Sequence, residues 1–220
     1  DETFEKIKAL RRELHKIPEL SGQERRTMEV LKTFLREHTS LSVTDRGGWF
    51  YALHQENGAE ETVAFRADMD AIKGAGNIPY HGCGHDGHSA ILAGLCLLTE
   101  GRVFQKNLCF LFQPAEETFY GAQSIVDKGH LDDVMNFIAV HIALSAENKP
   151  LPSHTVACGC RDFLSDRQLD VYLEGKAAHP CGASQEGKNA LLAACSATLN
   201  IHSIAPHEEG LCRVNVGEIH

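Results

Sequence analysis

The chain has 220 residues, 43% of them hydrophobic and 23% charged, and its 21 Lys and Arg residues face 30 Asp and Glu residues, which gives a formal net charge of −9. This composition is typical of a globular protein with one or two domains. The negative charge argues against nucleic acid and anionic membranes as partners, because both require a basic surface. No apolar run approaches the roughly 18 residues of a membrane span, and the charged start, DETFEKIKAL, is not a signal-peptide pattern.

Two helices and three short strands are predicted in the first third of the chain. Apolar residues recur at helical spacing over residues 2–16 and 23–38, and Pro18 ends the first segment. The strands that follow are LSVT (41–44), WFYALH (49–54) and TVAFRA (62–67). The pair Asn57-Gly58 between the last two strands is a hairpin signal, so we expect these strands to pair.

Strands and helices alternate in the middle of the chain. We expect helices over 88–99 and 120–128 and buried strands over 107–113 (NLCFLFQ) and 136–141 (NFIAVH). A near-continuous apolar strand is typical of a sheet that is covered on both faces. The alternation therefore predicts an α/β domain with a mixed, largely parallel sheet flanked by helices.

The pattern changes near residue 165. Residues 167–175 and 211–219 alternate with the period of half-exposed strands, and residues 186–204 form a helix with an Ala/Leu face. The sequence thus predicts two domains, 1–164 and the start of a smaller α+β domain over 165–220.

The cysteines indicate a reducing compartment. Of the eight, Cys96, Cys109 and Cys195 lie in apolar stretches, where a reduced cysteine acts as a small buried hydrophobe. We therefore expect the protein to be cytoplasmic.

Reactive side chains gather where the predicted strands end. The carboxyl ends of parallel strands meet at one edge of an open α/β sheet, and binding sites form there. The residues at these ends are Asp68 and Asp70 after the strand 62–67, Glu116 and Glu117 after 107–113, and His141 at the end of 136–141. Each taken alone has a simpler interpretation: a turn or helix cap for the aspartates, a solvated helix start for the glutamates, and a hydrogen-bonded core histidine for His141.

The segment HGCGHDGH (81–88) is the strongest metal-binding signal. In an extended chain His81, Cys83 and His85 lie on one face, and the glycines between them let the backbone approach an ion. Cysteine, histidine and glutamate together suit zinc, or manganese where carboxylates dominate. Because no paired C-x2-C motif is present, we expect an open catalytic site, in which one of the two adjacent glutamates binds metal and the other acts as general base.

Five stretches of the sequence carry a resemblance to a known family: LHKIPELSGQE, FRADMDAI, HGCGHDGHSAILAG, FQPAEETFYGAQSIVDKG and GKAAHP with EGKNALLAA. Together they resemble the M20 metallopeptidase family, in particular its amidohydrolase branch, and look most like the A-type aminobenzoyl-glutamate utilisation proteins of that branch. The branch includes plant auxin-conjugate hydrolases, hippurate-type carboxypeptidases and bacterial N-acyl-amino-acid amidohydrolases.

The resemblance implies a role for each site residue. Two divalent metal ions, Mn²⁺ or Zn²⁺, would be held by Cys83, His85, Glu117 and His141. Glu116 would be the general base, and Asp70 would orient a ligand. His179 would stabilise the oxyanion in a partner's active site, which makes residues 165–220 a lid and dimerisation domain, and Arg213 would help to hold the substrate carboxylate. The remaining residues of HGCGHDGH would be structural, His81 and His88 as supporting side chains and Asp86 as a helix cap.

The implied reaction is hydrolysis of the amide between an acyl or aroyl group and an amino acid, a small-molecule substrate. In relatives the loop between RADMDAI and HGCGHD is longer, and the chain continues past position 220 to a second lid half and a final metal-binding histidine. The alternative is therefore a truncated, non-catalytic metal-binding remnant that serves another chain as its partner subunit. Metal storage or sensing is a weaker third alternative, because it gives Glu116 and Glu117 no role.

Overall fold

A computed structural model describes residues 2–142, 145–146, 149–158, 167–204 and 214–219. The chain divides into two compact units, Asp1–Ser153 and His154–His220. The predicted boundary between residues 164 and 165 falls within 159–166 and so lies outside the described residues.

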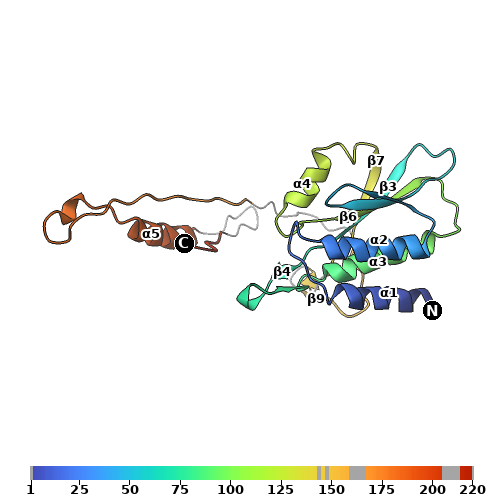
Figure 1. The fold of residues 1–220 in the computed structure, drawn as a ribbon, viewed down its shortest axis with the longest axis horizontal. Coiled ribbons are helices and arrows are strands. Elements are labelled where there is room, and N and C mark those ends of the chain that lie inside the picture. Colours follow the sequence, from blue (N-terminus) through green and yellow to red (C-terminus); the bar gives the residue numbers. More distant parts are fainter. Residues whose placement is uncertain (1, 143–144, 147–148, 159–166, 205–213, 220) are drawn as a thin grey trace. The chain divides into compact units, whose positions relative to one another are not determined.

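The described residues of the first unit form four α-helices and a central sheet, which are drawn in Figure 1. Its helices are α1 (Glu2–Leu14), α2 (Arg25–His38), α3 (His85–Thr99) and α4 (Tyr120–Val126). Its main strands are β1 (Ser42–Asp45), β2 (Phe50–His54), β3 (Thr62–Asp68), β6 (Asn107–Gln113) and β7 (Val134–Ala139). Short elements are β4 (Ile72–Lys73), the 3-10 helix Ala75–Asn77, β5 (Pro79–Tyr80), β8 (Ser145–Ala146) and β9 (Lys149–Pro150).

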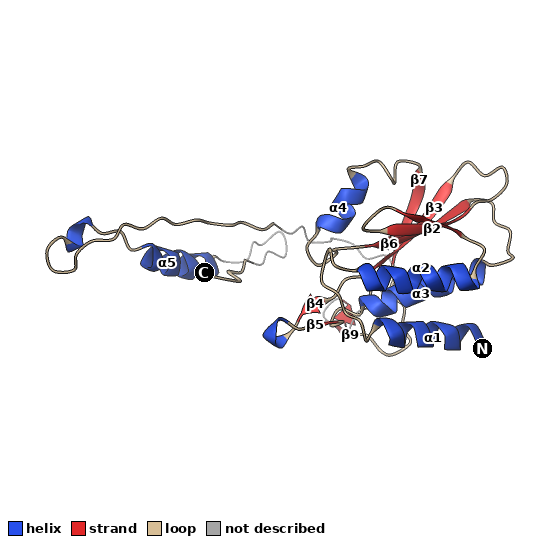
Figure 2. Ribbon diagram, viewed as in Figure 1, coloured by secondary structure: helices blue, strands red, loops and turns tan. Residues whose placement is uncertain are grey.

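The five main strands form one mixed sheet in the order β1-β2-β6-β3-β7. Strands β6 and β7 run parallel to β3, whereas β1 and β2 are antiparallel to their neighbours. Helices flank this sheet (Figure 2), so the prediction of an α/β fold is confirmed. The parallel strands bring the ends of β3 and β6 to the same edge, where Asp68 pairs in register with Gln113.

The predicted hairpin between β2 and β3 is wrong. The turn at Asn57-Gly58 forms, with Gly58 at φ +76°, but β6 lies between the two strands and pairs with both. A turn signal reports only local backbone geometry, and here the strongly apolar β6, with Phe110 and Phe112 fully buried, occupies the middle of the sheet.

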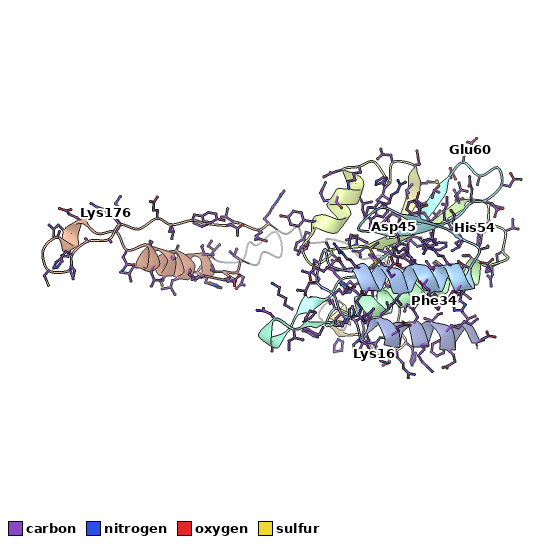
Figure 3. The ribbon with its side chains drawn as sticks, viewed as in Figure 1. Lys16, Phe34, Asp45, His54, Glu60 and Lys176 are labelled. Carbon is purple, nitrogen blue, oxygen red and sulfur yellow. The ribbon has the colours of Figure 1, made fainter. Side chains whose placement is uncertain are left out.

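The core lies on both faces of β6, because successive side chains of a strand point to opposite faces. Phe110 and Phe112 belong to the larger core under α1, α2 and α3, whereas Leu111 packs with Trp49 and with Ile125 of α4. Phe34 of α2, labelled in Figure 3, packs against the larger core.

Strand β7 was predicted to be buried, and it is exposed. Met135, Phe137 and Ile138 are each about half exposed. Within the described residues β7 pairs on one side only, with β3, so the sheet leaves its other edge open.

The second unit, described by itself, contains the helix α5 (Ala190–His202) and a 3-10 turn at Ser184–Glu186. The strands expected over 167–175 and 211–219 are absent from the described residues 167–175 and 214–219. In the described part of the second unit, the one isolated bridge joins Lys176 and Lys188. A strand requires a neighbour for its backbone hydrogen bonds, and the described part of this unit offers only that one bridge. Across the described chain, no helix is both long and apolar enough to cross a membrane.

Candidate metal centre

His85 lies at the centre of the candidate site, at the first residue of α3. Its Nδ1 is 3.2 Å from Asp70 Oδ1. Its Nε2 faces three further carboxylate oxygens, at 3.7 Å from Asp68, 3.7 Å from Glu116 and 3.6 Å from Glu117. The sequence places these groups together because Asp68 ends β3 and Asp70 follows it, the two glutamates follow β6, and the tight Gly84 turn at φ +78° starts α3 beside them.

The imidazole Nε2 of His85 is buried and has no hydrogen-bond partner among the described residues. A buried polar atom without a partner is costly, and three carboxylates around it lie too far away for hydrogen bonds. A cation between them would accept the nitrogen lone pair and neutralise the carboxylates. The donor set therefore fits a divalent metal ion on the evidence of its own geometry.

Cys83 completes one candidate ligand group. A ligand atom from each of Cys83, His85 and Glu117 lies within 4.8 Å of the others. Burial, together with hydrogen bonding to Glu117 and the negative charge of nearby carboxylates, raises the pKa of the Cys83 thiol to about 12. The thiol therefore stays protonated without a cation, and metal binding must displace its proton.

A second candidate group contains Asp68, His85, His88 and His141, whose ligand atoms also lie within 4.8 Å of one another. His88 has both ring nitrogens occupied: Nδ1 is 2.6 Å from Asp68 Oδ1, and Nε2 accepts the Ile142 N–H at 2.9 Å. Among the described residues, His141 forms a hydrogen bond only through Nδ1, which donates to the Ile142 carbonyl at 2.6 Å, so its Nε2 has no partner there. In this arrangement His88 contacts Asp68 and the backbone of Ile142.

Asp70 connects the parts of the site. It is 1% exposed and accepts hydrogen bonds from the Ser21 hydroxyl at 2.7 Å and from the Glu117 backbone N–H at 3.0 Å, in addition to its contact with His85. Burial alone would raise the pKa of Asp70, but the hydrogen bonds from His85, Ser21 and Glu117 lower it. Asp70 is therefore a buried carboxylate that contacts both His85 and the loop 114–119 after β6. We call this loop, which carries Glu116 and Glu117, the glutamate loop.

The two glutamates differ in their surroundings. Burial, reinforced by the negative charge of Asp68, raises the pKa of Glu116. A carboxylate with a raised pKa can take up and return a proton closer to neutral pH, which suits a general base and acid. Glu116 is not a member of either candidate ligand group, whereas Glu117 belongs to the group with Cys83.

Asp86 does not cap α3. It lies inside the first turn, and its buried carboxylate pairs with two residues of α1 and the turn after it, Arg11 at 3.0 Å and His15 at 2.7 Å. Gly84 occupies the N-cap position without a side-chain cap. A long-range ion pair has no local sequence signal, which explains why the sequence suggested a cap instead.

Two other predicted site residues belong to the second unit. His179 belongs to the second unit, where its Nδ1 accepts backbone N–H groups from Cys181 and Gly182, each at 3.2 Å. Arg213 lies outside the described residues. The sequence analysis gave Asp68 no role in the site. Its position beside Asp70 at a strand end was the signal that could have identified it as a site residue.

Several known proteins resemble this chain in sequence. The model of peptidase family M20/M25/M40 matches residues 64–210. The chain is 43% identical to one of the subunits of the p-aminobenzoyl-glutamate hydrolase of Escherichia coli (strain K12), over 70% of this chain and 39% of that protein. It is 39% identical to the indole-3-acetyl-aspartic acid hydrolase of Enterobacter agglomerans, over 71% of this chain and 39% of that protein. The chain thus spans 39% of the length of each of these relatives.

Solved structures show the same fold. The aminobenzoyl-glutamate utilization protein from Klebsiella pneumoniae matches with a TM-score of 0.72 and 29% identity, over 96% of this chain and 61% of that one. The Bacillus subtilis YxeP protein, described as a dinuclear metal binding peptidase from the M20 family, matches with a TM-score of 0.60 and 28% identity, over 64% of this chain and 44% of that one.

Proposed function

The chain belongs to peptidase family M20/M25/M40, and we propose that it forms part of a metal-dependent amidohydrolase. The proposed reaction is hydrolysis of the amide between an acyl or aroyl group and an amino acid. The observation that carries this proposal is the buried, unpartnered Nε2 of His85, which faces three carboxylates beside Cys83. The substrate class follows the names of the relatives, which act on aminobenzoyl-glutamate and indole-acetyl-aspartate.

Two divalent ions, Mn²⁺ or Zn²⁺, would be held by Cys83, His85, Glu117 and His141, and the oxygen of Asp68 lies within reach of the same group. The dinuclear description of the Bacillus subtilis relative supports two ions. When bound, such ions polarise the scissile carbonyl and make water more acidic.

Glu116 is the proposed general base and acid. Its side chain is about one-third exposed and borders the space around His85 Nε2, so it can reach both solvent and a substrate there. It takes a proton from the attacking water and returns it to the nitrogen of the leaving amino acid. The raised pKa of Glu116 favours this two-way transfer, because the protonated form is then accessible after the first step.

Residues of the second unit have proposed roles in substrate binding. Because Nδ1 of His179 accepts two backbone N–H groups, the ring carries its proton on Nε2, and this N–H can stabilise an oxyanion. We assign residues 165–220 to a lid and dimerisation domain, in which His179 of one protomer serves the active site of the other. Arg213 is proposed to hold the substrate carboxylate.

The proposed compartment is a reducing cytoplasm, and the cysteines support this proposal. Cys96 is buried and free, as is expected of a protein in a reducing cytoplasm. Cys195, expected to be buried, is exposed and also free.

The full-length protein tests the proposed function. After treatment with a chelator and reloading with Mn²⁺ or Zn²⁺, it should hydrolyse at least one of aminobenzoyl-glutamate, hippurate and the N-acetyl amino acids. The chelated protein, measured in parallel, should be inactive and recover on reloading. Failure to hydrolyse any of these compounds in the metal-loaded form contradicts the proposal.

A further inference from the structure

Besides Asp70, another buried carboxylate contacts the glutamate loop. It is Glu24, which lies near the start of the chain. Glu24 precedes α2 and is 3% exposed. Its Oε1 accepts the backbone N–H of Ala115 at 2.7 Å, across 91 residues of sequence. Although Glu24 occupies the N-cap position of α2, its side chain makes no cap hydrogen bond there. The carboxyl group is therefore directed at Ala115 and not at its own helix.

Ala115 has an unusual backbone conformation. Its φ is +49°, in the left-handed region that residues with a Cβ rarely adopt. Such a conformation costs free energy and persists only where surrounding contacts fix it. The hydrogen bond from Ala115 N–H to Glu24 is one of these contacts.

The carbonyl side of Ala115 is fixed as well. The N–H of Gly121 donates to the Ala115 carbonyl at 3.2 Å. A Cβ at Gly121 would collide with the carbonyl of Pro114, so only glycine permits this approach. The peptide groups around Ala115 are thus held by Glu24 on one side and by α4 on the other, and the next residue is Glu116.

We propose that Glu24 is a positioning residue that fixes the strained Ala115 backbone and thereby aims the Glu116 carboxylate at the reacting centre. This inference rests on the proposed function for the role of Glu116. Glu24 acts through Ala115 and is outside both candidate ligand groups, whereas Asp70 holds the next turn of the loop by the Glu117 N–H. The two carboxylates together fix the backbone on both sides of Glu116.

Two substitutions separate reach from charge in the full-length protein. Glu24→Gln keeps the length of the side chain and an acceptor oxygen for Ala115 but removes the charge. Burial raises the pKa of Glu24, so a neutral group is compatible with this environment. Glu24→Asp keeps the charge but is one methylene too short to reach Ala115. The matched control is Thr27→Val. Thr27 is a buried residue of α2, and its hydroxyl donates a hydrogen bond to Glu19.

We expect Glu24→Asp to lower kcat at least about tenfold, with KM within about threefold of wild type and unchanged metal content. Glu24→Gln and Thr27→Val should keep kcat within about threefold. A wild-type kcat for Glu24→Asp, or an equal loss of kcat in Glu24→Gln or Thr27→Val, would overturn the inference.

Amide hydrogen exchange of residues 114–121 provides a readout that does not depend on turnover. Exchange in this segment should be at least about tenfold faster in Glu24→Asp than in wild type, and unchanged in Glu24→Gln and Thr27→Val. If wild type hydrolyses nothing but exchange follows this pattern, the proposed function fails while the positioning of the loop stands. Unchanged exchange in Glu24→Asp would overturn the inference whatever the activity.

Discussion

The backbone N–H of Glu117 donates to Asp70 Oδ2 at 3.0 Å, so a residue after β3 holds the loop after β6. Asp70 also contacts His85 through its other oxygen. One buried carboxylate therefore sets the positions of two proposed metal ligands that arrive from different segments.

Asp70→Asn should weaken this arrangement. Both carboxylate oxygens of Asp70 accept hydrogen bonds, and the amide nitrogen that replaces one of them cannot accept any. We expect metal affinity or kcat to fall about 10–100-fold, the range typical of residues that orient metal ligands. Metal titration by calorimetry and steady-state kinetics measure the two quantities. Values equal to wild type would contradict the role given to Asp70.

Cys83→Ala should remove a metal ligand and its thiolate signal. With Co²⁺ in place of the native ion, wild type should show a thiolate-to-metal charge-transfer band that Cys83→Ala lacks, because only a thiolate ligand produces it. Cys158→Ala, which alters an exposed free thiol of the second unit, is the control and should keep the band. A band that persists in Cys83→Ala would place the metal elsewhere.

His88→Gln should affect stability more than metal content, because both ring nitrogens of His88 already have partners. Loss of these buried hydrogen bonds should lower the free energy of unfolding by about 1–3 kcal/mol. Urea denaturation measures this change, and elemental analysis should find the wild-type amount of metal. Loss of an ion with unchanged stability would make His88 a ligand.

Asp45 and Lys32 give a pH-dependent contribution to stability. Lys32 is almost buried and lies 2.5 Å from both Asp45 and Glu29. The hydrogen bond from Lys32 lowers the pKa of Asp45 in the folded state. Its contribution is therefore complete above the unfolded pKa near 3.8 and is lost as pH falls through the lower folded pKa.

Asp45→Asn should accordingly lower the free energy of unfolding at pH 7 by about 0.5–1 kcal/mol, because the Asp45 side chain is 42% exposed and solvent screens its pairing with Lys32. The difference from wild type should shrink as pH falls below the unfolded pKa near 3.8. Urea denaturation at several pH values checks this, with Glu60→Gln as an exposed control that should change little. A difference that stays constant from pH 7 to pH 2 would contradict the assigned pair.

The sequence predicted those parts of the fold that depend on local pattern. Strand β6 was placed at its observed bounds, because five consecutive apolar residues (108–112) between polar segments have few alternatives. The insertion of β6 between β2 and β3 was not predictable from Asn57-Gly58, because strand order depends on which strands bury the most apolar surface. The same holds for β7, whose apolar sequence indicated burial but not its position at the edge of the described sheet.

The candidate site was predictable to the extent that strand ends meet at one edge. That rule brought together Asp70, Glu116 and His141 with the segment around His85, and the structure places them close together. The supporting contacts had no such signal. The bond between Glu24 and Ala115 depends on a left-handed alanine, a conformation that residue type alone does not indicate.

The proposed role of Glu116 as general base is tested most directly by the kinetics of Glu116→Gln, measured on the full-length, metal-loaded protein. Glutamine preserves the size of the side chain but cannot take a proton from water. The metal content of Glu116→Gln should stay at the wild-type value, while its kcat should fall at least about 100-fold, as expected when a general base is lost. A kcat within about threefold of wild type, with metal retained, would contradict the proposal that Glu116 is the general base.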